Sequence, residues 1–133
     1  MLYENSMIHR DIKPENILIH NGNFKIADFG LSKVVKDPEV EFNFSVKGTP
    51  IYMAPEIPEH KEGSSKIDLF SLGVVVYRLA FRGEFPFFDQ GRKYRSINEY
   101  FRELKIRKLI IPEMSGRSSE LIHLIKRMLD KDR

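Results

Sequence analysis

The chain has 133 residues, of which 41% are hydrophobic and 31% charged, and it carries a formal net charge of +3. This length and composition predict a single soluble, globular domain with its own hydrophobic core. The slight basic excess is too small to indicate a nucleic-acid partner. Because the chain contains no cysteine, disulfides and thiolate metal sites are excluded, and a cytoplasmic location is favoured.

The first ten residues do not contain the apolar core of a secretory signal peptide. The longest apolar stretch, residues 67–81, is interrupted by Asp68, Ser71 and Arg78 and is too short to span a bilayer. We therefore expect no membrane partner. The stretch is apolar on nearly every helical face, which is typical of a helix buried on all sides.

Residues 8–18, IHRDIKPENIL, place many polar groups between apolar flanks. Pro14 has no N–H to donate and pushes the preceding residue towards extended geometry, which argues against a continuous helix. The sequence therefore predicts an irregular polar loop, and loops held by a rigid scaffold commonly carry catalytic groups. Its side chains include an imidazole, a guanidinium, a carboxylate, an ammonium group and a carboxamide, from His9, Arg10, Asp11, Lys13 and Asn16.

Two short β-prone runs follow, residues 17–20 and 24–27, on either side of the tripeptide Asn21-Gly22-Asn23. Asn-Gly between two such runs is a strong signal for a hairpin. The second run leads directly into Asp28-Phe29-Gly30. The predicted hairpin therefore returns Asp28 to the side of the polar loop, where two carboxylates and an amide would share a small volume.

Residues 31–53 show no sustained periodicity and are too long for a simple connection, which indicates a functional or disorder-prone loop. A short helical turn is predicted to begin at 54–56. The helix over 67–81 would be capped by Ser65, with Asp68 three residues later in a capping-box-like position.

Two amphipathic helices are predicted in the last third of the chain. Ser96 and Glu99 form a capping box at the start of the first helix. The predicted fold class is therefore mainly α with a small β-hairpin (α+β), in one domain without internal repeats. The apolar stripes recur at helical spacing and consist of Ile97, Tyr100, Phe101 and Leu104 in the first helix and Leu121, Leu124, Ile125 and Met128 in the second.

Four motifs occur in order along the chain: HRDIKPEN at 9–16, DFG at 28–30, GTPIYMAPE at 48–56 and DLFSLG at 68–73. In order and spacing they resemble the motifs of eukaryotic protein kinases of the serine/threonine type. The resemblance implies an incomplete protein-kinase-like C-terminal lobe over residues 1–133 that starts at the catalytic loop, with the N-terminal lobe absent. It also implies ATP and Mg²⁺ as cofactors and a protein substrate with a serine or threonine hydroxyl.

The resemblance implies roles for the residues of the active site. Asp11 would be the catalytic base, and Lys13 would contact the γ-phosphate of ATP. Asn16 and Asp28 would bind Mg²⁺ through hard oxygen ligands. Leu18 would contribute to the nucleotide site. The alternative for the polar side chains is a solvated loop, which the order of the four motifs disfavours.

Regulatory roles are implied by the same resemblance. Arg10 would pair with a phosphate that an upstream activating kinase places on Ser45, and an unmodified loop serine is the alternative. The hydroxyl of Thr49 would bond the catalytic aspartate and lysine.

The resemblance also implies an apolar column that ends at the adenine. Its lower part would consist of Leu18, Val75 and Leu79.

Supporting roles are implied for four further residues. His9 and Phe29 would stack in an internal apolar spine. Asp68 would hold the backbone of the catalytic loop, or serve simply as a carboxylate at a helix N-terminus. Glu56 would pair with an arginine that lies a few residues beyond the Asp132 position. Arg133 comes too early to be that arginine, so we expect Glu56 to lack this partner.

Two functions remain open: part of an active serine/threonine kinase, or a non-catalytic kinase-like interaction module. The intact polar residues favour the first, whereas the missing lobe leads us to expect no activity from these 133 residues alone.

The family's helix before the catalytic loop survives only around Leu2 and Tyr3, so apolar surface on 67–81 should be exposed. One basic cluster is expected to be a solvated helix face rather than a docking site: Arg92, Lys93, Arg95, Arg102, Lys105, Arg107 and Lys108.

Overall fold

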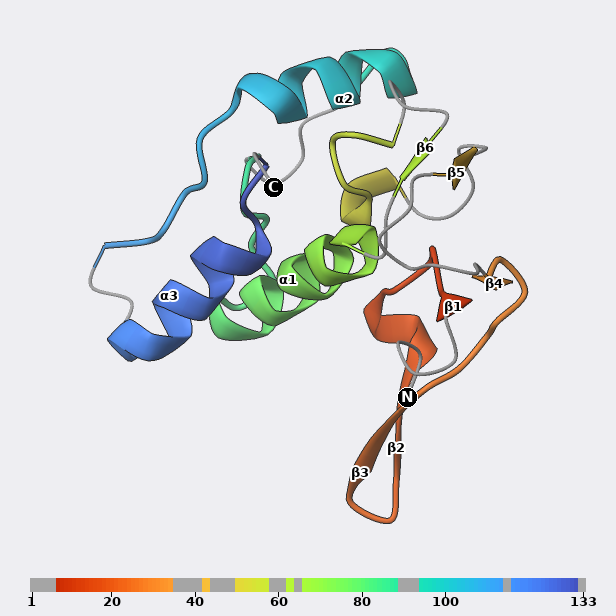
Figure 1. The fold of residues 1–133 in the computed structure, drawn as a ribbon. Helices are drawn as coiled ribbons and strands as arrows, with labels where there is room; N and C mark the ends of the chain where they lie inside the picture. Colours follow the sequence, from red (N-terminus) through yellow and green to blue (C-terminus); the bar gives the residue numbers. More distant parts are fainter. Residues whose placement is uncertain are drawn as a thin grey trace.

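The computed structural model describes residues 7–34, 42–43, 50–57, 62–63, 66–88, 94–113 and 116–131. Figure 1 shows α1 at the centre of the described chain, between α3 on one side and a protruding hairpin on the other. The architecture is α+β with helices predominating, as the sequence predicts. The described residues form three α-helices, α1 (Lys66–Ala80), α2 (Ile97–Ile106) and α3 (Ser119–Met128), and two 3-10 helices, η1 (Pro14–Asn16) and η2 (Pro50–Tyr52).

The predicted hairpin is confirmed as β2 (Ile17–His20) paired antiparallel with β3 (Asn23–Ile26). Its loop is the dipeptide Asn21-Gly22, one residue shorter than the tripeptide expected from the sequence. Both loop residues have positive φ angles, 50° and 73°. This geometry suits Asn-Gly, because glycine has no Cβ and asparagine tolerates the left-handed region.

Two further antiparallel pairs are present among the described residues. β1 (Met7–Ile8) pairs with β4 (Lys33–Val34), and β5 (Phe42–Asn43) pairs with β6 (Glu62–Gly63). These strands are not evident from the sequence, because two residues are too few to show a period of two. The segment 31–53, expected from the sequence to be a loop without regular structure of its own, therefore contributes the short strands β4 and β5.

The second 3-10 helix corrects another boundary. The helical turn predicted to begin at 54–56 is a hydrogen-bonded turn, in which the Ile57 N–H donates to the Ala54 carbonyl at 3.3 Å. The helical residues lie just before it, in η2, and Pro50 begins that helix. Proline suits this position because its missing N–H would have no partner within the helix.

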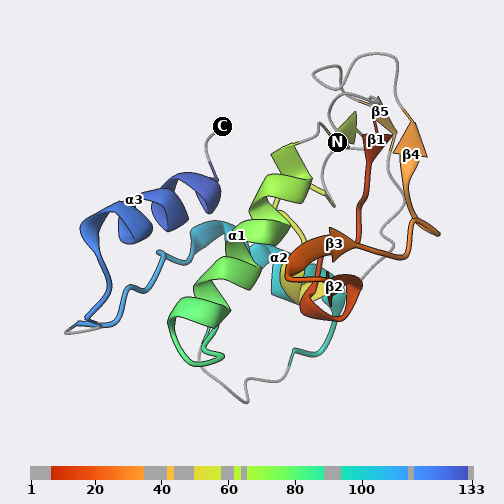
Figure 2. The ribbon, with the colours of Figure 1, turned by 90° about the horizontal axis from the view of Figure 1, so that it is seen from below.

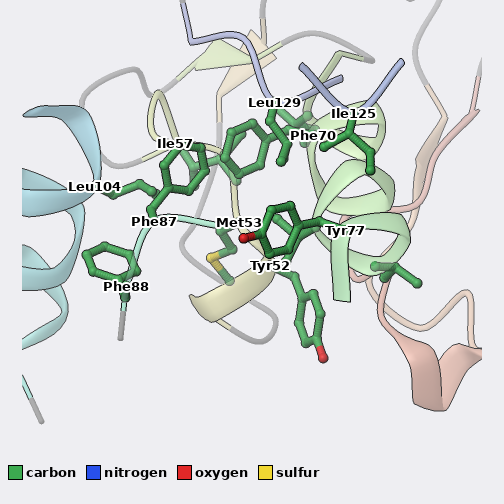
Figure 3. Close-up of a cluster of buried hydrophobic side chains, with 14 of the residues drawn as sticks. Tyr52, Met53, Ile57, Phe70, Tyr77, Phe87, Phe88, Leu104, Ile125 and Leu129 are labelled. Atoms are coloured by element: carbon green, nitrogen blue, oxygen red, sulfur yellow. The ribbon is translucent and has the colours of Figure 1, made fainter. Parts of the chain in front are cut away.

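The core lies along the buried face of α1 and includes side chains from α2 and α3 (Figure 3). Phe70 stacks on Phe87 with ring centres 6.0 Å apart. The hydroxyl of Tyr77 donates a hydrogen bond to the Ile110 carbonyl at 2.7 Å, which ties α1 to the segment after α2. Burial of this phenol raises the pKa of Tyr77 to about 12, so it remains a neutral donor near pH 7.

Serine caps open α2 and α3. The hydroxyl of Ser96 accepts a hydrogen bond from the Glu99 N–H at 3.2 Å, as predicted, and Ser118 caps α3 in the same way. The Glu99 carboxylate accepts from the Arg95 N–H at 2.7 Å, one residue before the position of a standard capping box. The core-facing residues of the predicted stripes are Tyr100, Phe101, Leu104 and Ile125, whereas Ile97 and Leu124 are exposed.

Helix α1 differs from its prediction in burial. Leu69 and Leu79 are 45% and 78% exposed, and Leu72 is also exposed, so the helix is buried on one face and not on all sides. A pattern that is apolar all round cannot show which face is covered, and α1 packs mainly on α3 and η2. The expected exposure of apolar surface on this helix is confirmed. The predicted cap Ser65 lies outside the described residues.

Gly73 allows α1 and α3 to pack closely. A Cβ at this position would lie 2.9 Å from the Met128 Cβ and 3.0 Å from the Leu129 Cδ2. We expect Gly73→Val to lower the free energy of unfolding by about 2 kcal/mol, because overpacking of a rigid contact outweighs any gain in helix propensity. Urea denaturation followed by circular dichroism measures this change.

Leu124→Val provides the control, because it places a valine at a half-exposed position of α3. It should lower the free energy of unfolding by less than about 1 kcal/mol. If Gly73→Val were as stable as this control, the two helices would not be in the tight contact described here.

An apolar groove of about 620 Å³ lies between the exposed face of α1, the β2–β3 hairpin and the polar loop. The hairpin contributes one face, because Ile17 pairs with Ile26 and Ile19 pairs with Phe24. The groove is lined by Met7, Ile12, Pro14, Ile17, Ile19, Phe24, Ile26, Asp68, Leu69, Leu72, Val75, Val76 and Leu79.

No helix in the described part of the chain is long and apolar enough to cross a membrane.

The groove should bind an apolar dye. We expect the double replacement Leu72→Gln and Leu79→Gln to reduce the fluorescence of bound ANS by about half, because it replaces two exposed apolar side chains of the lining. Thermal stability should change little, since neither side chain lies in the core. Leu124→Gln, at an exposed leucine outside the groove, should leave dye fluorescence unchanged; an equal decrease would mean that the dye reports general surface hydrophobicity.

Candidate active site

The polar loop contains the short 3-10 helix η1, which begins at Pro14. Lys13 is fully extended, with φ −158° and ψ 164°, as expected for a residue before proline. Pro14 then opens η1, and the N–H of Asn16 donates to the Lys13 carbonyl at 3.0 Å. This tight turn places the Asn16 side chain against Asp11, which lies two residues before Lys13.

Three of the predicted catalytic residues are in direct contact. Lys13 Nζ lies 2.8 Å from Asp11 Oδ2. Asn16 Nδ2 donates to the Asp11 carbonyl oxygen at 2.8 Å and to Asp11 Oδ2 at 3.2 Å. The hydrogen bond to the Asp11 carboxylate raises the pKa of Lys13 above its ordinary value, against a smaller effect of burial. The lysine is therefore a cation held beside the carboxylate.

Asp28 is brought to this group by the hairpin. The N–H of Ala27 donates to the Asn16 backbone carbonyl at 2.8 Å, so the end of β3 is tied to η1. Asp28 is exposed, and one of its carboxylate oxygens accepts from the Gly30 N–H at 3.2 Å. Its negative charge also contributes to the raised pKa of Lys13. Two carboxylates, an ammonium group and an amide thus lie in one neighbourhood.

His9 connects the polar loop to the same strand end and is fully buried. Its Nε2 lies 3.0 Å from the Ala27 carbonyl, and its Nδ1 accepts from the Asp11 N–H at 3.3 Å. These partners assign the proton to Nε2, because a carbonyl can only accept and an amide N–H can only donate. The His9 and Phe29 rings are in contact with centres 5.1 Å apart, but they meet edge to face and Phe29 is 46% exposed, so the internal stack that the resemblance implies is not formed in full.

Asp68, in the first turn of α1, holds the backbone of the polar loop. Its two carboxylate oxygens accept from the N–H groups of His9 at 2.7 Å and Arg10 at 2.9 Å. Burial raises the pKa of Asp68, and the two backbone donors act in the opposite direction. Arg10 has a left-handed φ of 69°, an unfavourable conformation for a long side chain, so these bonds stabilise a strained backbone.

The oxygen atoms present fit a hard divalent cation such as Mg²⁺. Asn16 uses its Nδ2 for Asp11, which leaves its Oδ1 available as a ligand, and the exposed Asp28 carboxylate offers a second oxygen. The described residues contain no cluster of three or more His, Cys, Asp or Glu side chains that could hold a metal. Mg²⁺ is commonly held by one or two protein oxygens together with water and substrate phosphates, and this pair suits that mode.

The structure describes only some of the residues for which regulatory or supporting roles were predicted. Ser45 and Thr49 lie outside the described residues, so the regulatory roles proposed for them stay predictions. Arg10 Nε donates to the Leu31 carbonyl, which places its guanidinium beside the segment after the DFG motif. Glu56 is partly buried and has an interaction partner within the chain, and whether the arginine implied by the resemblance is missing stays a prediction.

The predicted apolar column is not formed as expected. Leu18 is 51% exposed and lies on the opposite face of β2 from the groove, whereas Val75 and Leu79 line the groove. Side chains alternate across a strand, so the hairpin residues on the groove side are Ile17 and Ile19. The period-two alternation of the hairpin was the signal that could have identified them.

A sequence model described as the protein kinase domain matches residues 1–133. The chain therefore belongs to the protein kinase family. It is 37% identical over 132 residues to an Aurora kinase of Eremothecium gossypii, covering 98% of this chain and 33% of the relative. It is 33% identical over 132 residues to a cAMP-dependent protein kinase type 3 of Saccharomyces cerevisiae, covering 98% and 30%.

Over a shorter stretch of 91 residues the chain is 44% identical to the serine/threonine-protein kinase TIO of Arabidopsis thaliana, covering 68% of this chain and 7% of the relative. The chain thus spans a third or less of the length of these relatives. Their names identify serine/threonine kinases among the relatives, as the four motifs predict.

Proposed function

We propose that this chain is part of the C-terminal lobe of a serine/threonine protein kinase, which transfers the γ-phosphate of ATP to a protein hydroxyl. The observation that carries the proposal is the hydrogen-bonded group of Asp11, Lys13 and Asn16, with Asp28 returned beside it by the hairpin. This group has the charges that phosphoryl transfer requires: a carboxylate for the substrate hydroxyl and a cation for the phosphate.

Each residue would have a separate part in the reaction. Asp11 would orient the substrate hydroxyl and accept its proton, and Lys13 would neutralise charge on the transferred phosphoryl group. Asn16 and Asp28 would hold Mg²⁺, which, when bound, screens the negative charge of the phosphates. Asn16 would also fix the Asp11 carboxylate through its Nδ2.

Removal of the Asp28 carboxylate tests this assignment in the longest gene product that contains the chain. We expect Asp28→Asn to raise the Mg²⁺ concentration for half-maximal phosphate transfer to a serine peptide by about tenfold or more, because a charged oxygen ligand is lost. Glu113→Gln removes an exposed carboxylate elsewhere and should leave the Mg²⁺ dependence unchanged.

A second candidate is a non-catalytic interaction module, and the apolar groove of about 620 Å³ beside the polar loop is the observation that favours it. The two candidates differ in nucleotide chemistry. If the longest gene product neither transfers phosphate nor binds ATP in the presence of Mg²⁺, the kinase proposal is wrong and the interaction module remains. We expect the 133 residues alone to transfer no phosphate in either case.

A further inference from the structure

The groove side of α1 carries a regular apolar stripe. Leu69, Leu72, Val76 and Leu79 all line the apolar groove and are spaced by three, four and three residues. This is the spacing of the apolar seam of a coiled coil, whose positions fall on one side of a helix. Leu69 and Leu79 are 45% and 78% exposed, and Leu72 is also exposed, so no described element covers them. We call these four residues the α1 stripe.

The hairpin extends the α1 stripe into a larger apolar surface. Ile19 and Phe24 are directly opposite each other in the β2–β3 pair, and both line the groove. They are 71% and 77% exposed, and in Figure 1 the hairpin protrudes from the body of the molecule. A hairpin of two strands is at best marginally stable in water by itself, so a surface that packed on these two side chains would stabilise it.

The exposed area is large enough for one side of a specific interface. A large apolar side chain has on the order of 100–200 Å² of accessible surface when fully exposed. At their exposed fractions, the side chains of the α1 stripe and of the hairpin together present roughly 500 Å². Two such surfaces in contact would bury about 1,000 Å², which is the lower limit for a specific protein complex.

The chemistry of the groove favours an apolar protein surface over a small or charged ligand. Asp68 is the only polar side chain among the described residues that line the groove. Both of its carboxylate oxygens are engaged by the N–H groups of His9 and Arg10. A site for a small molecule usually contains a few polar groups that orient the ligand, and the described side chains of this groove offer none.

The α1 stripe is complementary to itself in an antiparallel arrangement. Its three-four-three spacing is the same in both directions along the helix. A two-fold axis at the middle of the stripe therefore brings Leu69 of one copy to Leu79 of the other, and Leu72 to Val76. Reciprocal contacts of this kind form an isologous interface, which is characteristic of symmetric dimers, the commonest homo-oligomers. A second copy of the chain thus matches the groove in both apolar character and spacing.

We propose that two copies of this chain associate through the α1 stripe, with their α1 helices antiparallel and each hairpin packed beside the α1 helix of the other copy. The proposal does not rest on the proposed function, because the contact uses none of the side chains assigned to phosphate transfer.

Sedimentation equilibrium of the 133-residue chain at increasing concentration tests the proposal. We expect the weight-average mass to rise from 15.6 kDa towards twice that value. The ANS fluorescence per chain should fall by about half over the same range, since the second copy covers the groove that binds the dye in the dilute monomer. The double replacement Leu72→Gln and Leu79→Gln should remain monomeric throughout. Leu124→Gln, outside the groove, should associate like the unmodified chain, and circular dichroism checks that each variant is folded.

Cysteine cross-linking tests the antiparallel arrangement, because the chain contains no cysteine of its own. Leu69→Cys, labelled with ¹⁵N, is mixed with unlabelled Leu79→Cys under mild oxidation, and mass spectrometry identifies the products. We expect disulfide dimers with one copy of each, since these positions meet across the axis. Leu69→Cys alone should yield few dimers, because its two copies would lie ~15 Å apart along the helices. Leu124→Cys, on α3, should form none with either variant.

Three results would overturn the proposal. A mass of 15.6 kDa at every concentration, with undiminished ANS fluorescence, would mean that the groove is open to a different partner. Association that persists in the double glutamine variant would place the contact on another surface. Disulfide dimers of Leu69→Cys alone, in a yield equal to that of the mixed dimers, would contradict the antiparallel pairing.

Discussion

Replacing Asp11 with asparagine is expected to lower phosphate transfer, by the longest gene product that contains this chain, by about two to four orders of magnitude. The amide cannot accept the proton of the substrate hydroxyl. Its carbonyl oxygen can still accept from Asn16 Nδ2 and Lys13 Nζ, which now contact Asp11 Oδ2. The geometry of the loop should therefore persist while the base is removed.

Kinetics and stability together separate this effect from a loss of structure. In Asp11→Asn the kcat should fall while the KM for ATP changes by less than about threefold, because the nucleotide contacts assigned to Lys13 and Asp28 remain. The melting temperature should stay within a few degrees of the unmodified protein. Glu113→Gln, which removes one exposed carboxylate, should keep full activity. Retention of kcat in Asp11→Asn would show that this carboxylate is not the base.

The neighbourhood of Asp11 and Asp28 could be predicted from the sequence because the signals that create it are local. Pro14 limits the polar loop to a short 3-10 helix, and Asn21-Gly22 sets a tight hairpin that returns the chain to it. The structure shows the hairpin within a residue of its expected place, whereas the loop predicted to be irregular contains the short 3-10 helix η1. Backbone geometry specified by proline and glycine is therefore readable without knowledge of the tertiary fold.

Contacts between distant segments could not be predicted in the same way. The Arg78 guanidinium donates a hydrogen bond to the hydroxyl of Tyr52, which lies 26 positions earlier in the sequence, and no local pattern pairs these two residues. The apolar repeat of α1 indicates a helix but does not show that Leu69 and Leu79 face an open groove. The strands of the β1–β4 pair are too short to have a pattern at all. These features depend on which surfaces meet after the helices pack.

The Asp68 carboxylate links local and distant structure, and its removal should have a large effect on stability. We expect Asp68→Ala to lower the free energy of unfolding by about 2–5 kcal/mol, because the N–H groups of His9 and Arg10 both lose their acceptor inside the protein. Arg10 would also lose a bond that stabilises its left-handed backbone. Urea denaturation of the 133-residue chain measures the change.

Amide signals of the loop should report the same event locally. In Asp68→Ala the ¹H–¹⁵N resonances of His9 and Arg10 should shift and exchange faster with solvent, whereas that of Tyr77, towards the C-terminal end of α1, should not. Asp68→Asn keeps one accepting oxygen and should lose about half as much stability. Leu69→Ala, at an exposed neighbour on α1, should cost less than about 1 kcal/mol. If Asp68→Ala were no more destabilising than Leu69→Ala, the carboxylate would be an ordinary residue of a helix N-terminus and the position of Asp11 would depend on other contacts.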